Sequence, residues 1–180
     1  MKLYILPLLF TDNGLLEHLS SVLAEAFKMP VSIRPESFSL EEGFDPVRNQ
    51  YNSTWILSKL LQEVPEEDCK ILGVTSLDLF VPVLTFVFGE AQLQGKAAVV
   101  SSYRLRDELY GLPRNPERLR ERLEKEAIHE LAHTFGLVHC REPQCVMHSY
   151  TYAEEVDFKS KDFCSTCTVL LAQNKKQAAS

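Results

Sequence analysis

The 180-residue sequence predicts one α/β (α+β) domain, with a mixed twisted sheet of about five strands packed against helices. Two observations support this class: strand and helix patterns alternate in the first half of the chain, and further strand patterns follow. A third is a long amphipathic helix at residues 116–135, with clear start and stop signals. The length suits one compact core, so we expect residues 1–180 to form a single domain.

The N-terminal part alternates apolar runs with turn signals. Its first helix is indicated by leucine, valine, alanine and phenylalanine side chains that recur at helical spacing after the sequence TDNG. The expected elements are a buried strand at 2–10, a turn and cap at 11–14, a helix at 15–27, a short strand at 31–33 and a loop at 39–48.

The middle of the chain continues with a helix and three strands. The helix is expected at about 52–63, with Ser53 or Thr54 near its cap and Trp55 facing inward. The strands are expected at 71–79, 85–88 and 97–103, with Gly89 and Gly95 as turn residues. This order implies that the early parallel strands are joined by right-handed crossovers.

Charge and composition exclude several classes of protein. The net charge is -6 and the pI is near 5.4, which argues against nucleic acid or an anionic membrane as a partner. The one dense basic stretch, at 114–125, alternates with glutamates, so we expect a solvated helix face. The apolar N-terminus is interrupted by Pro7 and followed by acidic residues, a poor match to a signal peptide. We expect a cytoplasmic protein with reduced thiols.

The third helix has the clearest boundaries. Asn115 is the expected cap, Pro116 the first helical residue and Gly136 the point where the helix stops. A stripe of residues spaced by four is expected to face the sheet: Leu119, Leu123, Ala127, Leu131 and Phe135. Glu121 and Lys125 can pair on the outer side.

The end of this helix contains HELAHTFGLVH, residues 129–139. Residues four apart on a helix point to the same side, so His129 and His133 can bind one metal ion. Glu130 is adjacent to the first histidine and can reach a water on the metal without ligating it. The pattern therefore predicts two ligands and a general base.

A third ligand requires the helix to end. His139 lies ten residues after His129, about 15 Å along a continuous helix, which is too far for a shared ion. Gly136 can adopt positive φ and turn the chain back, so His139 can return to the metal. Three imidazoles leave one tetrahedral position open, as in catalytic zinc sites.

Four of the five cysteines follow this helix. Cys140 and Cys145 form one close pair, and Cys164 and Cys167 form another. Two such pairs suit a closed, structural zinc site, whereas two disulfides or unrelated thiols remain the alternative. We expect residues 137–170 to form a zinc-binding part below the third helix. Cys69 is expected to be a small buried apolar residue.

The extended motif, with a methionine eight residues after His139, resembles the metzincins, and several further segments resemble the archaemetzincins. These are HELAHTFGLVHC, FCSTC at 163–167, RNQYNSTWIL at 48–57, GVTSLDLF at 73–80 and FVFGEAQLQGKAAVVS at 86–101. The resemblance implies a metzincin-like fold with two zinc ions. It implies catalytic zinc on His129, His133 and His139, with Glu130 as base. It also implies structural zinc on Cys140, Cys145, Cys164 and Cys167, and Met147 in the methionine turn.

These expectations combine into a zinc-dependent metallopeptidase that acts on peptides or small proteins, as a monomer. An aminopeptidase is one alternative, which would need an acidic group for the substrate amine. A non-catalytic zinc-binding or peptide-binding protein of the same fold is another, although Glu130 argues against it. The substrate strand could pair with residues 85–88 or 97–103. His18 and His148 are expected to be surface or hydrogen-bonded histidines.

Overall fold

The computed structural model describes residues 1–35, 38–64 and 68–178. Its main sheet has five strands in the order β2-β1-β5-β8-β7. The bounds are β1 Lys2–Leu8, β2 Val31–Ile33, β5 Cys69–Thr75, β7 Gly89–Ala91 and β8 Ala97–Ser101. All neighbours are parallel except β7, which runs antiparallel to β8 at the edge. The predicted mixed sheet is confirmed.

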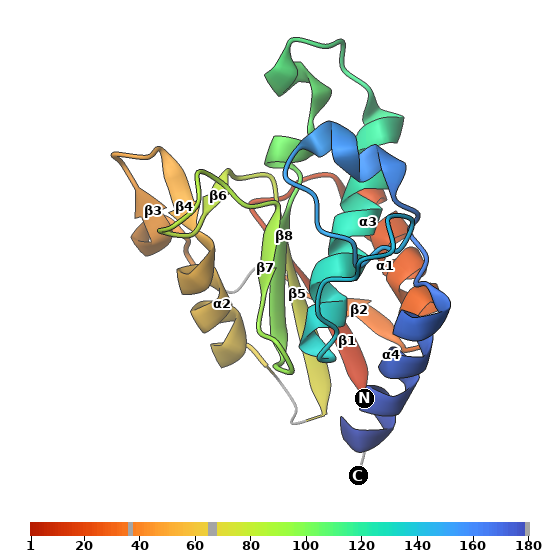
Figure 1. Ribbon diagram of the computed structural model, residues 1–180. Helices are drawn as coiled ribbons and strands as arrows, with labels where there is room; N and C mark the ends of the chain where they lie inside the picture. The colour runs from red at the N-terminus through yellow and green to blue at the C-terminus, as the bar shows by residue number, and fades with distance from the viewer. Residues whose placement is uncertain (36–37, 65–67, 179–180) are drawn as a thin grey trace.

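Helices cover both faces of this sheet (Figure 1). Helices α1 (Asn13–Phe27) and α3 (Pro116–Thr134) pack in one apolar cluster, and α2 (Ser53–Gln62) packs in the other. Each helix begins at a capping side chain: Asp12, Asn52 and Asn115. The cap of α2 is therefore Asn52, one residue before the predicted Ser53. The predicted stripe on α3 contributes to the first cluster.

A second, three-stranded sheet was not predicted. It has the order β3-β4-β6, with bounds β3 Phe44–Asp45, β4 Gln50–Asn52 and β6 Leu79–Phe80. The expected loop at 39–48 therefore contains a 3₁₀ turn, Glu41–Gly43, and a strand. The expected strand at 71–79 divides between the two sheets. The strands of this second sheet have only two or three residues, too few for a periodic pattern to be recognised in the sequence.

The predicted strand at 85–88 was wrong. The strand β7 begins at Gly89, which therefore lies within the sheet rather than in a turn. The backbone carbonyls of Leu84 and Thr85 accept hydrogen bonds from the side chain of Arg48, and Gln50 also donates to Thr85. Side chains therefore bind the start of this segment. Its end has only isolated backbone bonds, from the Val87 amide to the carbonyl of Leu79 and from the Ser101 amide to the carbonyl of Phe88.

Strand β8 is also shorter than the predicted strand at 97–103. The strand ends at Ser101, whose Oγ donates to the carbonyl of Leu77 and accepts from the amide of Tyr103. Two 3₁₀ helices follow, Tyr103–Leu105 and Asp107–Tyr110. Hydroxyl bonding to the backbone favours such turns over a continued strand.

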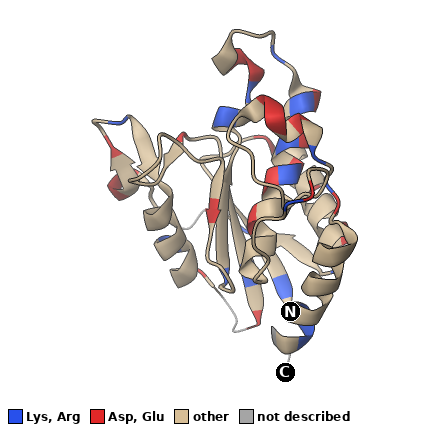
Figure 2. Ribbon diagram, viewed as in Figure 1, with Lys and Arg blue, Asp and Glu red and all other residues tan. Residues whose placement is uncertain are grey.

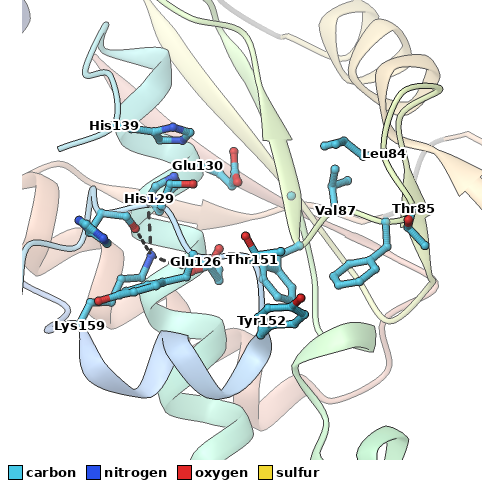
Figure 3. Close-up of a pocket in the computed structure, with 16 residues that line it drawn as sticks. Leu84, Thr85, Val87, Glu126, His129, Glu130, His139, Thr151, Tyr152 and Lys159 are labelled. Atoms are coloured by element: carbon cyan, nitrogen blue, oxygen red, sulfur yellow. Dashed lines mark hydrogen bonds and ion pairs between the residues drawn. The ribbon is translucent and has the colours of Figure 1, made fainter. Parts of the chain in front are cut away.

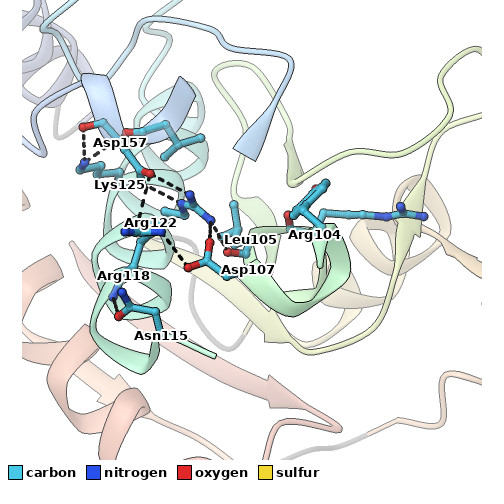
Figure 4. Close-up of polar contacts among 10 residues, drawn as sticks. Arg104, Leu105, Asp107, Asn115, Arg118, Arg122, Lys125 and Asp157 are labelled. Atoms are coloured by element: carbon cyan, nitrogen blue, oxygen red, sulfur yellow. Dashed lines mark hydrogen bonds and ion pairs between the residues drawn. The ribbon is translucent and has the colours of Figure 1, made fainter. Parts of the chain in front are cut away.

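The basic stretch at 114–125 is only partly solvated, contrary to expectation. Figure 2 shows acidic and basic residues interspersed on this half of α3 and around it. Arg122 is 2% exposed and donates to Asp107, Asp157 and the carbonyl of Leu105 (Figure 4). Its neighbour Lys125 donates to the carbonyls of Val156 and Asp157 instead of pairing with Glu121. These contacts fix η4, a 3₁₀ helix at Ala153–Phe158, against α3.

The described part of the C-terminal segment is helical, which the sequence analysis did not predict. Helix α4 spans Ser165–Ala178. Leu171 is buried in the first apolar cluster, and Lys175 donates to the carbonyl of Phe27. In the part of the chain that the structure describes, no helix is both long and apolar enough to cross a bilayer.

Candidate active site and thiol cluster

The last turn of α3 ends in the geometry that the sequence predicts. Gly136 has φ of +85°, and its amide bonds to the carbonyl of His133. The amide of Leu137 bonds to the carbonyl of Ala132, which completes a Schellman motif. The chain therefore reverses within two residues and brings His139 back beside the helix.

Other elements bind the free carbonyls at this helix end. The amide of Gln94 donates to His133, Lys70 Nζ to Thr134 and Asn174 Nδ2 to Phe135. An α-helix leaves its final carbonyls without partners in the helix. Lys70 and Asn174 each supply a donor to one such carbonyl, and Gln94 adds a second bond to the His133 carbonyl, which already accepts from Gly136. They fix the end of α3 to β5, to the loop between β7 and β8, and to α4.

The three predicted histidines converge. The possible ligand atoms of His129, His133 and His139 all lie within 4.8 Å of one another. His129 Nδ1 is 2.9 Å from the carbonyl of Val146, and His133 Nδ1 is 2.6 Å from that of Leu137. Because a carbonyl only accepts, each Nδ1 carries the proton and each Nε2 presents a lone pair.

The positions of these lone pairs fit a zinc ion. The Nε2 atoms of His129 and His133 are 3.1 Å apart. Two lone pairs at this distance repel unless a cation lies between them. Tetrahedral zinc with bonds of about 2.05 Å would place two nitrogens about 3.3 Å apart. Burial also lowers the pKa of all three imidazoles, which favours the neutral form that binds metal.

Glu130 lies beside the histidines and is 7% exposed. Burial raises its pKa well above the usual value, the Glu126 carboxylate raises it further, and Lys159 opposes both. A buried carboxylate with a raised pKa is a stronger proton acceptor than an exposed one. The side chain thus has the position that the sequence predicts for a general base.

Gly89 makes room for this carboxylate. A Cβ atom at residue 89 would lie 2.6 Å from Cγ of Glu130 and 2.5 Å from the carbonyl oxygen of Val99. Both distances are below van der Waals contact, and the second partner is backbone that cannot swing away. Only glycine therefore lets β7 pass this close to Glu130.

If Glu130 is the general base that the sequence predicts, we expect Gly89→Ala to lower kcat by about 100-fold, because a displacement of such a base by about 1 Å has effects of that size. The melting temperature should also fall, since Val99 must shift. The matched control is Gly14→Ala, whose new Cβ meets Asp12 Oδ1 at 3.6 Å, an ordinary contact. Steady-state kinetics and thermal melts measure both effects. A Gly89→Ala enzyme with wild-type kcat would show that Glu130 is not constrained by β7.

The site opens into a cavity of about 510 Å³ between α3 and the segment before β7 (Figure 3). The segment 84–89, the segment 148–152 and residues of α3 line it. Two lining residues escaped the sequence analysis: Glu126 and Lys159, whose Oε1 and Nζ are 2.8 Å apart and almost fully buried. Lys159 also donates to the carbonyl of His148. No local pattern signals this pair, because the partners are 33 positions apart.

The four predicted cysteines also converge. The sulfur atoms of Cys140, Cys145, Cys164 and Cys167 all lie within 4.8 Å of one another, and none is in a disulfide. The Sγ atoms of Cys140 and Cys164 are 3.8 Å apart. Tetrahedral zinc with bonds of about 2.3 Å gives a sulfur separation of about 3.8 Å. Cys69 is separate and 2% exposed, as expected.

Met147 connects the two groups. It is fully buried, and its carbonyl accepts from the amide of Cys140. The amide of His148 bonds to the carbonyl of Cys145, which closes a tight turn around Met147. His148 Nδ1 bonds to the carbonyl of Cys140, and His18 pairs with Glu124. Both histidines are therefore hydrogen-bonded, as expected.

The fold and the histidine group define a class of protein, the zinc metallopeptidases. The model of Peptidase family M54 matches residues 13–173, and the chain belongs to that family. An archaemetzincin of Methanocaldococcus jannaschii is 40% identical over 167 residues, which cover 93% of this chain and 90% of the relative. One from Methanopyrus kandleri is 43% identical over 162 residues, 89% of this chain and 86% of the relative.

Solved structures support the same family assignment. The crystal structure of the Methanopyrus kandleri archaemetzincin has a TM-score of 0.83 and 37% identity, and covers 98% of this chain and 96% of that one. That of a zinc-dependent peptidase from Methanocorpusculum labreanum also has a TM-score of 0.83, with 36% identity, and covers 94% of this chain and 99% of that one. The protein is thus a zinc metallopeptidase with the archaemetzincin fold.

Proposed function

We propose that His129, His133 and His139 hold the catalytic zinc and that Glu130 is the general base of peptide-bond hydrolysis. The observation that carries this proposal is the convergence of proton-free Nε2 atoms beside a buried carboxylate at the wall of a cavity. When bound to these histidines, a zinc ion would supply Lewis-acid chemistry, namely a lowered pKa for a water and polarisation of the scissile carbonyl. The Glu130 carboxylate takes a proton from the attacking water and later delivers it to the leaving nitrogen.

The edge strand β7 is the best candidate for binding the substrate backbone. The sequence left two segments open, 85–88 and 97–103. Strand β8 contains most of the second and lies between β5 and β7, so both its edges are paired. Strand β7 is the last strand of its sheet, and the preceding residues Leu84–Phe88 line the cavity. An extended peptide can add to such an edge through backbone hydrogen bonds.

We favour cleavage within peptides over removal of the first residue. An aminopeptidase needs an acidic group to bind the substrate amine. The acidic side chains among the described lining residues are Glu126 and Glu130. Glu126 is paired with Lys159 and Glu130 is the base, so neither serves the amine. N-terminally acetylated peptides should therefore be cleaved as well as unmodified ones.

The function is tested by digesting a peptide library with zinc-loaded protein and with the same protein after chelation. Mass spectrometry of the products should show new internal cleavage sites with the loaded protein alone, and re-added zinc should restore them. If the loaded protein cleaves no peptide, the non-catalytic zinc-binding or peptide-binding alternative replaces this proposal.

We also propose a second, structural zinc on Cys140, Cys145, Cys164 and Cys167. In this proposal residues 1–180 act as one catalytic unit and as a monomer. Residues 137–170 form its zinc-holding part. The thiols of the cluster must stay reduced to bind metal, which suits a cytoplasmic location.

The two sites should exchange zinc differently. We expect two zinc ions per chain, of which the three-histidine site loses its ion to mild chelation or acid. The four-thiolate site should retain its ion, because it has one more ligand and no open position. Metal analysis before and after timed chelation measures this. A single ion per chain, or a disulfide between Cys140 and Cys145 in freshly reduced protein, would contradict the prediction.

A further inference from the structure

The cavity extends beyond the histidines toward a second set of side chains. Glu126 is three residues before His129 on α3, so it lies about 5 Å along the helix from that histidine. It faces Lys159, and Figure 3 shows the pair beside Thr151 and Tyr152. Four aromatic residues also line the cavity: Phe86, Phe88, Tyr150 and Tyr152. This region therefore combines aromatic walls with an ion pair.

The Glu126–Lys159 ion pair has hydrogen-bonding capacity left over. An ammonium group has three N–H donors. One points to Glu126 Oε1 at 2.8 Å and one to the carbonyl of His148 at 3.2 Å. His129 Nδ1 lies 3.5 Å away, but it already donates its proton to Val146. Among the described residues, the third donor therefore has no good acceptor.

We propose that this region binds the side chain of a substrate residue next to the scissile bond, and that it selects tyrosine over phenylalanine. The inference rests on the proposed function and extends it to the substrate class. An aromatic ring packs against the aromatic walls, and a hydroxyl at its tip bonds with the Glu126–Lys159 ion pair. A phenylalanine in the same place offers the ion pair no hydrogen bond.

The first test uses peptides that differ only in tyrosine or phenylalanine. One member of each pair carries tyrosine, and the other phenylalanine, at a single position from the third residue before the cleaved bond to the third after it. We expect one position adjacent to that bond to show a tyrosine preference of about tenfold or more in kcat/KM. Equal values at all six positions would overturn the inference.

The second test removes the ion pair. The double variant Glu126→Met/Lys159→Met is preferred to a single change, because one remaining buried charge would destabilise the fold. The ratio of the two kcat/KM values within one enzyme does not depend on how much enzyme is active. That ratio should fall to about one or below. The control is Lys161→Met, the same change at an exposed residue two positions along, which should keep the ratio. A ratio that survives the double variant would overturn the inference.

A binding measurement separates this inference from the proposed function. The same peptide pairs are titrated by calorimetry into Glu130→Ala protein, which keeps the Glu126–Lys159 ion pair. Tighter binding of the tyrosine peptide supports the inference even if the wild-type protein hydrolyses neither peptide. Equal binding of both peptides, together with equal hydrolysis by wild-type protein, overturns the inference and leaves the proposed function intact.

Discussion

Replacing Glu130 with alanine should reduce peptide hydrolysis by at least about 1,000-fold, with the melting temperature nearly unchanged. Glu130 is the only carboxylate among the described cavity residues that is both beside the histidines and outside an ion pair, so no neighbour can replace it as base. General-base catalysis contributes about 10²–10⁴-fold in rate. The fold should not suffer, because the variant removes no metal ligand.

The direction of the pKa shift supports this expectation. Glu130 has a raised pKa in the folded chain, so its ionised form costs stability above the pKa of the unfolded chain. The alanine variant loses the attraction to Lys159 but also removes the larger cost of burying the carboxylate. Kinetics, zinc content and thermal melts should be measured together, with Glu121→Ala on the exposed side of α3 as the control. Activity within tenfold of wild type would exclude Glu130 as the base.

Replacing Cys164 with serine should lower activity and stability together. Cys164 lies 24 residues after Cys140, yet their sulfurs are neighbours. Cys140 follows His139 directly and its amide bonds to Met147. Loss of one thiol would weaken the proposed second zinc site and loosen the segment that carries His139. We expect the melting temperature to fall by about 10 °C or more, and kcat/KM by about tenfold or more.

The control for this variant is Cys69→Ser, the same change at a buried cysteine outside the cluster. It should lower the melting temperature by less, with two zinc ions and wild-type specific activity retained. Zinc content therefore distinguishes the two variants. If Cys164→Ser kept full activity and stability, the cysteine cluster would be incidental and His139 would be held in some other way.

The histidine group was predictable because its geometry is local. His129, Glu130, His133 and Gly136 lie within two helical turns, where spacing fixes direction, and the Schellman motif follows from one glycine. The four cysteines were predictable for a related reason, since thiolate pairs at such spacings have few other uses. The main sheet also followed from apolar runs that are long enough to be recognised.

The features that the sequence did not predict depend on contacts between residues that are distant in the chain. Lys159 meets Glu126, and Arg122 meets Asp157, across more than 30 positions. Nothing in the sequence near Arg122 distinguishes it from its solvated neighbours on α3. The segment 85–88 has the composition of a strand, but the side chains of Arg48 and Gln50 bind the carbonyl of Thr85 at its start. Such pairings appear only once the chain has folded.

The bond between Asn174 and the carbonyl of Phe135 has a consequence for protein synthesis. Asn174 is made 39 residues after Phe135, so the end of α3 leaves the ribosome well before its partner on α4. Until α4 docks, that carbonyl depends on water, and the helix end beside His133 and His139 lacks one of its three attachments. Of the three attachments of this helix end, the one to α4 is therefore the last that the nascent chain can form.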